Sequence, residues 1–313
     1  MAGSKRAATA VVSSRAGRLV VVLTMLVVVP AVIGTLVAGP SAGAALPVGV
    51  VVSVLCSMTY GRRAALGCVP LLVVAGFLAA LTAGTWPWVV VIGVVAGIAG
   101  WAVPSGRSGP LAVITLIVIT VPGQPDVESA VVFAGFLGLG AALGLALAAR
   151  MHAPEEVERP RRGGRPLVYM AVSGVAVAIG GALGVALGWE RAYWVPLTIV
   201  VLGQVERAEV PGRAGARLLG TMVGVVIVVP LVAAVVPAGA LSVLGVVVML
   251  VALSIDPSPY WRFVALLTAG VVLLLTPASG GGIDGIALER FWATVLGVAI
   301  ISAAVALVGA FER

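Results

Sequence analysis

Aromatic, hydroxyl and cationic side chains with the potential to bind a ligand gather in one stretch of the second half. Trp189, Glu190 and Arg191 open it, and Arg213 and Arg217 follow after an apolar segment. Arg213 and Arg217 are four residues apart, which places both on one face of a helix. The candidate residues for a substrate pathway are Tyr193, Trp194, Pro196, Thr198, Gln204, Arg213, Arg217 and Thr221.

Residues for bond-making chemistry are scarce. The single lysine is Lys5 in the N-terminal tail, so a Gly-Lys-Ser/Thr phosphate loop is excluded. The single histidine, His152, lies in a polar segment, and Cys56 and Cys68 lie in apolar segments without metal-site spacing. We interpret both cysteines as packing residues. The sequence therefore predicts no enzyme, no catalytic residues, no metal site and no cofactor.

Composition indicates that lipid surrounds most of the chain. Apolar residues make up 61% of the sequence and charged residues only 10%, with a mean hydropathy of +1.20. A soluble domain carries roughly 25% charged residues. The net charge of +7 is spread singly or in short clusters between apolar runs. This distribution follows the positive-inside rule of membrane proteins and does not form the basic stripe of a nucleic-acid-binding protein.

Twelve apolar segments are separated by charges, prolines and glycine clusters, which predicts an all-α, polytopic helical membrane protein. About 20 apolar residues are needed to cross a bilayer as a helix. The first run could be a signal peptide, but it exceeds the usual 7–15 apolar residues, which favours an uncleaved helix. The predicted segments are 19–38, 43–59, 64–83, 86–103, 110–121, 129–149, 167–188, 192–205, 217–236, 239–255, 261–276 and 287–310.

Charge placement predicts the orientation. With the N-terminus and the C-terminus inside, 17 of the 19 basic residues fall on the cytoplasmic side, and only Arg191 and Arg290 fall outside. Six spans per half give two parallel repeats. The predicted divisions are a cytoplasmic tail (1–18), a first six-helix half (19–149), a cytoplasmic linker (150–166) and a second six-helix half (167–313).

Short or interrupted segments recur in both halves. The fifth and eighth segments are short, their counterparts (the eleventh and second) are modest in length, and Pro47 and Pro196 interrupt the second and eighth. Matched short or broken helices point to a transport site where the halves meet. The alternative is that these helices are buried in the bundle and need not match the bilayer. Glycines spaced by four, in the series Gly180, Gly184 and Gly188 and in the pairs Gly140/Gly144 and Gly220/Gly224, predict close helix packing.

A family resemblance rests on the motif around Tyr193. Tyr-Trp-x-Pro-Leu-Thr, then Gln204, then Arg-x3-Arg-x2-Gly-Thr-x2-Gly resembles the FUSC family of fusaric acid resistance and aromatic acid exporter-like membrane proteins. The stretch 289–297 looks like a related late-helix pattern, whereas the first half lacks the Tyr-Trp-x-Pro motif. The resemblance implies an inner-membrane exporter of organic anions, typically aromatic carboxylates. Many members carry a large cytoplasmic domain, and here only the linker 150–166 stands in that place.

The leading hypothesis is therefore a secondary efflux transporter for a small organic anion in the inner membrane. Arg213 and Arg217 would supply positive charge at the inner mouth, while Tyr193, Trp194 and Thr198 would line or gate the path. Two alternatives remain: a passive anion channel, and a non-transporting subunit of a larger assembly. The expected partners are the anion and membrane lipids, with a homo-oligomer or partner subunit left open and no nucleic acid.

Overall fold

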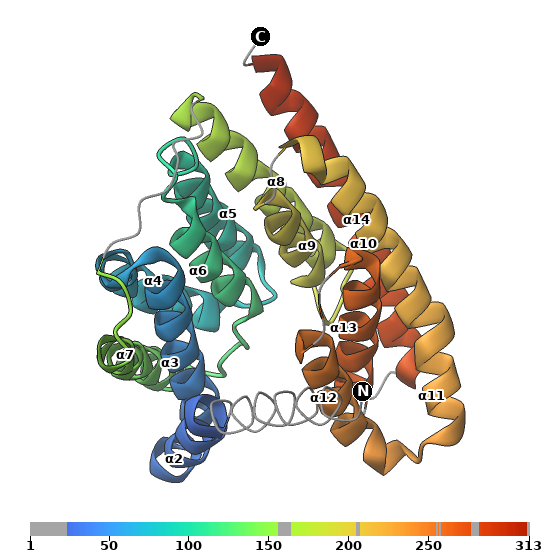
Figure 1. Ribbon diagram of the computed structural model, residues 1–313, viewed down its shortest axis with the longest axis horizontal. Coiled ribbons are helices and arrows are strands. Elements are labelled where there is room, and N and C mark those ends of the chain that lie inside the picture. Colours follow the sequence, from blue (N-terminus) through green and yellow to red (C-terminus); the bar gives the residue numbers. More distant parts are fainter. Residues whose placement is uncertain are drawn as a thin grey trace, which may run out of the picture. The chain divides into compact units, whose positions relative to one another are not determined.

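A computed structural model describes residues 24–155, 164–204, 207–254, 256, 258–276 and 282–311 (Figure 1). Regular structure within these ranges is helical throughout, as the sequence predicts. The predicted tail (1–18), the start of the first segment, most of the linker's acidic part, Glu206 and Pro277 lie outside the described residues.

Each predicted segment coincides with a helix or with a run of joined helices. Proline occupies the first or second position of six of them, a placement that suits the start of a helix. The helices are α2 (Val29–Ala38), α3 (Pro40–Tyr60), α4 (Arg62–Thr82), α5 (Trp86–Trp101), α6 (Ser108–Thr120), α7 (Val127–Arg150), α8 (Pro166–Ala186), α9 (Trp194–Gly203), α10 (Val210–Val223), α11 (Val229–Val235), α12 (Ala238–Ser254), α13 (Tyr260–Leu275) and α14 (Gly282–Phe311). The π-helical turns η1 (Thr24–Val28) and η3 (Gly224–Val228) join α2 and α10–α11.

Six helical stretches in the described residues are long and apolar enough to cross a membrane, so the protein is a multi-pass membrane protein. They are Ser41–Tyr60, Arg62–Thr82, Val127–Arg150, Pro166–Ala186, Arg207–Val232 and Ile283–Phe311. Six further apolar helices are shorter, with 10 to 17 residues.

Three sequence expectations differ from the structure. The second segment is not short, because α3 continues for 21 residues through Pro47. Pro196 lies in the first turn of α9 and therefore does not interrupt it. The ninth and twelfth segments begin earlier than predicted, at Val210 and Gly282. In the ninth and twelfth segments, polar residues near the helix start make that part of the sequence look like a loop.

The chain forms two compact units. Unit 1 contains residues 1–83 and 109–161, and unit 2 contains residues 84–108 and 162–313. In unit 1, α3 and α4 pack against α7, and α2 packs on α3. The Ser41 hydroxyl donates a 2.6 Å hydrogen bond to Gln124 Oε1 and ties the start of α3 to the loop before α7.

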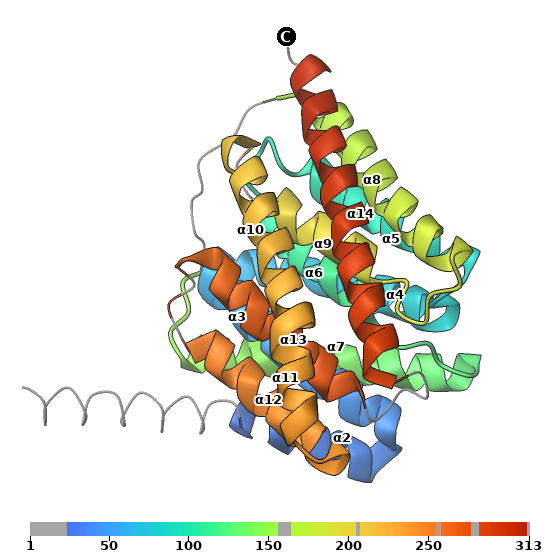
Figure 2. The ribbon, with the colours of Figure 1, turned by 90° about the vertical axis from the view of Figure 1, so that its right-hand side faces the viewer.

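Unit 2 takes α5 from the first half of the sequence and packs it along α8 (Figure 1). The long helix α14 contacts α8, α9 and α10, and α13 lies against both α10 and α12. Figure 2 shows α14 and α10 side by side along this unit. The candidate site residues from 193 to 221 all belong to unit 2.

Glycines spaced by four lie at helix contacts, which confirms the packing prediction for most of them. A Cβ on Gly140 would lie 2.2 Å from the Leu46 carbonyl oxygen of α3, and one on Gly220 would lie 2.4 Å from the Trp261 oxygen of α13. Gly184 is similarly close to Ala192, 2.6 Å from its Cα. Gly188 differs, because it ends the α8 region with a φ of +66° and has open space around it.

We expect Gly140→Ala to destabilise unit 1, because backbone of α3 cannot yield to the added methyl group without moving the helix. Overpacking of this kind costs on the order of 1–3 kcal/mol. The measurement is the thermal unfolding midpoint of the purified protein in detergent. Gly135→Ala on the same helix is the matched control, since a methyl group added there would meet nothing within 4 Å. Equal midpoints for the two variants would show that the close contact does not matter.

Candidate functional site

Arg217 is buried in the interior of α10. Because α10 begins at Val210, Arg217 lies seven residues inside the helix rather than at its start, and only 5% of the residue is exposed. Its Nη1 donates a 3.2 Å hydrogen bond to the Tyr260 hydroxyl of α13, while its Nε has no hydrogen-bond partner. The guanidinium therefore keeps unused donor capacity inside an apolar bundle.

Arg290 is a second buried arginine, on α14. It lies eight residues after the helix start, which is about 12 Å along the axis. It is 5% exposed, and both its Nε and its Nη1 lack hydrogen-bond partners. Its Cζ lies 5.1 Å from the centroid of the Trp194 indole, within the range of a cation–π contact.

The two buried cations act on one another without a described counter-ion. α10 packs against α14, and the charge of Arg217 bears on Arg290, so their interaction is repulsive. Among the described residues, neither forms an ion pair with a carboxylate. Burying an unpaired ion costs about several kcal/mol. An anion between α10 and α14 would offset that cost, so this pair is the centre of the candidate site.

α10 and α14 present the arginines within the same sequence pattern. Arg217 is followed by Gly220, Thr221 and Gly224, and Arg290 by Ala293, Thr294 and Gly297 at the same offsets. Offsets of three, four and seven keep these residues on one helix face. The Thr221 hydroxyl is buried without a hydrogen-bond partner, whereas Thr294 donates to the Arg290 carbonyl at 2.9 Å. Each arginine thus shares a helix face with small residues, which allow another helix to pack closely there.

Two aromatic rings connect the buried arginines to more peripheral ones. The Trp194 indole contacts both Arg290 and Arg191, with the Arg191 Cζ 5.6 Å from its centroid. Tyr260 bonds Arg217 through its hydroxyl and has the Arg213 Cζ 5.3 Å from its ring. Two series of contacts result: Arg191, Trp194 and Arg290 form one, and Arg217, Tyr260 and Arg213 form the other, on helices α14 and α10 that pack together.

The peripheral arginines differ from the buried pair because each has carboxylate partners. Arg213, with about half its side chain exposed, lies 3.6 Å from Glu209 one helical turn earlier. Arg191 Nη1 lies 3.2 Å from Glu190 and 3.6 Å from Glu289. The Arg191 backbone N–H also donates to Glu289 Oε1 at 2.8 Å, which fixes the loop before α9 to α14. Carboxylates therefore neutralise Arg191 and Arg213, whereas Arg217 and Arg290 have no carboxylate partner among the described residues.

The remaining predicted residues have different surroundings. Trp194 is 1% exposed and forms an edge-on contact with Tyr193, with ring centroids 6.0 Å apart. Thr198 is fully buried, donates to the Trp194 carbonyl at 3.0 Å and lies against Gly297 of α14. Gln204 is exposed at the far end of α9, and its amide points back to the Val200 carbonyl at 3.5 Å.

Sequence reasoning places Arg290 in a solvated region outside the bundle and assigns no roles to Tyr260 or Glu289. The signal that identifies Arg290 is the shared Arg-x2-small-Thr-x2-Gly pattern of α10 and α14. Tyr260 carries no sequence signal, because its role depends on the packing of α13 against α10.

The apolar helices define a multi-pass membrane protein whose second unit encloses a cationic site. The family model described as fusaric acid resistance protein-like matches residues 175–304. This match confirms the FUSC family resemblance, and it covers α9, α10 and α13, together with most of α8 and α14. No curated protein and no solved structure matches the chain.

We expect Arg290→Met to raise the thermal unfolding midpoint of the anion-free protein. Methionine fills similar space without an unpaired buried charge, and apolar replacement of buried ions gains on the order of 1–4 kcal/mol. Scanning calorimetry in detergent, with chloride replaced by a bulky anion, measures the change. Arg262→Met is the control, because Arg262 is exposed. A lower midpoint for Arg290→Met would show that the guanidinium is structurally satisfied.

Proposed function

We propose that the protein transports small organic anions, with Arg217 and Arg290 as its central binding groups. The observation that carries the proposal is the pair of buried guanidinium groups with unpartnered donors and without a carboxylate among the described residues. A charge in a membrane-spanning helix is costly and is retained where it serves a function. Guanidinium groups bind carboxylates through paired hydrogen bonds, which favours a carboxylate as the ligand.

An aromatic carboxylate is the proposed substrate class, and efflux by a secondary mechanism is the proposed direction and mode. The Trp194 and Tyr260 rings beside the arginines offer apolar surface to a flat substrate. The direction rests on the family resemblance, since residues 175–304 match the fusaric acid resistance protein-like model. The inner membrane is the corresponding location.

Two parallel six-helix repeats remain part of the proposal, and helix contacts support them. In the first half α2 contacts α3, and α7 contacts both α3 and α4. The corresponding helices of the second half behave alike, since α8 contacts α9, and α14 contacts both α9 and α10. In sequence order, the short helices α5 and α6 correspond to α12 and α13, although α5 belongs to unit 2 and most of α6 to unit 1.

Exposed charges support the proposal that the short helices also cross the membrane, with the N-terminus and the C-terminus of the chain in the cytoplasm. Arg107 follows α5, and Asp256 and Arg262 lie around the connection from α12 to α13; all three are exposed. A charge at the tip of a hairpin that ended within the lipid would cost several kcal/mol. The tips therefore reach water, and the proposed twelve crossings place them in the cytoplasm.

Cysteine labelling checks this orientation. In a background with Cys56→Ala and Cys68→Ala, we expect Asp284→Cys to react with a membrane-impermeant maleimide in intact cells. Ser105→Cys should react only after the cells are permeabilised, because the proposed topology puts residue 105 inside. Both positions are exposed in the structure. Labelling of both from the same side would refute the topology.

Flux measurements test the transport site. We expect Arg217→Gln and Arg290→Gln each to lower benzoate flux from loaded proteoliposomes by about tenfold or more, the equivalent of one charge-assisted hydrogen bond. Glutamine keeps hydrogen-bonding capacity and removes the charge. Arg213→Gln should have a smaller effect, because Arg213 is half-exposed and already paired with Glu209.

The control is Arg262→Gln, an exposed arginine at the start of α13 whose guanidinium lies over Trp261. Unchanged flux in both buried-arginine variants would sink the role of these residues. No flux from the wild-type chain at all would favour the non-transporting subunit.

A passive anion channel is the second candidate, because the buried residues described include no Asp or Glu for proton coupling. The carrier is favoured by the seclusion of the arginines, each only 5% exposed, since a conducting pore keeps its lining wet. Planar-bilayer recording separates them. Unitary currents would identify a channel, whereas saturable flux driven by a proton gradient would identify a carrier.

A further inference from the structure

We propose that a pocket at the Arg191 end of unit 2 is a second binding site for the transported carboxylate, in which Glu289 occupies the substrate's position. The proposal rests on the transport function above, because it concerns the same anion. We call this cavity the Arg191 pocket, and its volume is about 320 Å³. Gly188, Trp189, Glu190, Arg191, Gly285, Ile286, Leu288, Glu289 and Trp292 line it.

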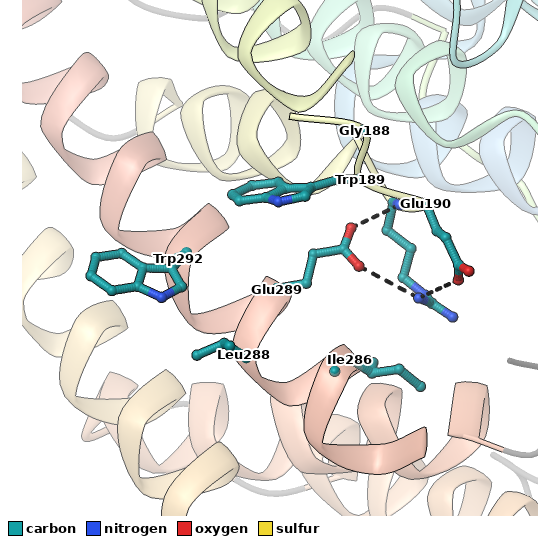
Figure 3. A pocket seen from close by; sticks show the side chains of 9 residues that line it. Gly188, Trp189, Glu190, Ile286, Leu288, Glu289 and Trp292 are labelled. Carbon is teal, nitrogen blue, oxygen red and sulfur yellow. Dashed lines mark hydrogen bonds and ion pairs between the residues drawn. The ribbon is translucent and has the colours of Figure 1, made fainter. Parts of the chain in front are cut away.

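The Glu289 carboxylate is bound as a free carboxylate would be. Oε1 accepts from the Arg191 backbone N–H at 2.8 Å, and Oε2 lies 3.6 Å from Arg191 Nη1. Both donors belong to one residue of the loop before α9, whereas Glu289 comes from α14 (Figure 3). Arg191 is largely buried, with 12% of its side chain exposed. A carboxylate that enters the pocket can replace Glu289 on the Arg191 N–H and beside its guanidinium without a new arrangement of Arg191.

The pocket lies next to the central site in the series of contacts. Arg191 and Arg290 both approach the Trp194 ring, at 5.6 Å and 5.1 Å from its centroid. Glu289 directly precedes Arg290 on α14, so the pocket and the buried arginine share one helix. A substrate carboxylate held by Arg191 would therefore be separated from Arg290 by the Trp194 ring.

The pocket walls indicate a carboxylate with a flat apolar body. Figure 3 shows the Trp189 and Trp292 rings on the side of the Glu289 side chain away from the ion pair. Ile286 and Leu288 supply further apolar surface. Ligand pockets begin at about 300 Å³, so this volume suits a single-ring acid such as benzoate. Acetate has the same carboxylate and lacks the ring, which makes it the matched probe.

If Glu289 and the substrate compete for Arg191, the direction in which Glu289→Gln changes the benzoate affinity can be predicted and tested. Removing the Glu289 charge frees Arg191, so Glu289→Gln should bind benzoate more tightly. Removing Arg191 should abolish that gain. Glu190→Gln is the matched control, because Glu190 also contacts Arg191 and its substitution removes one charge from the same pocket, but its side chain is 69% exposed. Displacement predicts a large effect for Glu289 and a small one for Glu190, whereas a general change in potential predicts equal effects.

The experiment measures binding of labelled benzoate to the full chain in nanodiscs, in a background of Arg217→Gln and Arg290→Gln that removes the central site. Adding Glu289→Gln should lower the Kd for benzoate by about tenfold, with a smaller change for acetate, and adding Arg191→Gln as well should abolish binding. Thermal unfolding of each variant checks that it is folded.

Three outcomes would overturn the pocket proposal: no effect of Glu289→Gln, an equal effect of Glu190→Gln, or benzoate binding that persists without Arg191. The same experiment is independent of the transport function. If wild-type vesicles move no benzoate while the Glu289→Gln background still binds it through Arg191, the transport function fails and the pocket stands. If vesicles transport benzoate and the Glu289 and Arg191 substitutions change nothing, the pocket fails alone.

Discussion

Two like charges held in an apolar helical bundle are the constraint around which unit 2 is arranged. Arg217 and Arg290 cannot be stabilised by water, since each is only 5% exposed, and the described residues offer them no carboxylate. What contacts them instead is a phenolic hydroxyl at Arg217 and an indole face at Arg290. Such groups soften the cost of a buried cation without neutralising it. The bundle therefore retains an attraction for negative charge that no internal group described here satisfies.

Close backbone packing makes this arrangement possible. Gly220 and Gly224 let α10 lie against α13, which brings Tyr260 to Arg217. Gly297 lets α14 lie against Thr198, on the helix whose first residue, Trp194, covers Arg290. In lipid, helices associate through such small-residue contacts rather than through apolar burial. The glycines thus determine which aromatic ring each arginine meets.

The helical architecture follows from the sequence because apolar length and charged breaks are local properties. The helix starts at Val210 and Gly282 do not, since Arg213, Arg217 and Arg290 read as solvated ends until tertiary burial is known. The motif around Tyr193 leads to half of the site, namely Trp194, Thr198, Arg217 and Thr221. Tyr260 and the Glu289–Arg191 contact join distant segments, so no spacing along the chain predicts them.

The membership of α5 in unit 2 has a consequence for biosynthesis. α5 is made before α6 and α7, yet its packing partner α8 follows the polar segment after α7. A membrane-inserted α5 must therefore wait for at least three further helices before its glycine-lined face is covered, since Gly93, Gly97 and Gly100 all meet α8. Consecutive elements are usually adjacent in space. The late pairing supplies unit 2 with a helix from the first half of the sequence, so residues 167–313 alone lack a helix of their own unit.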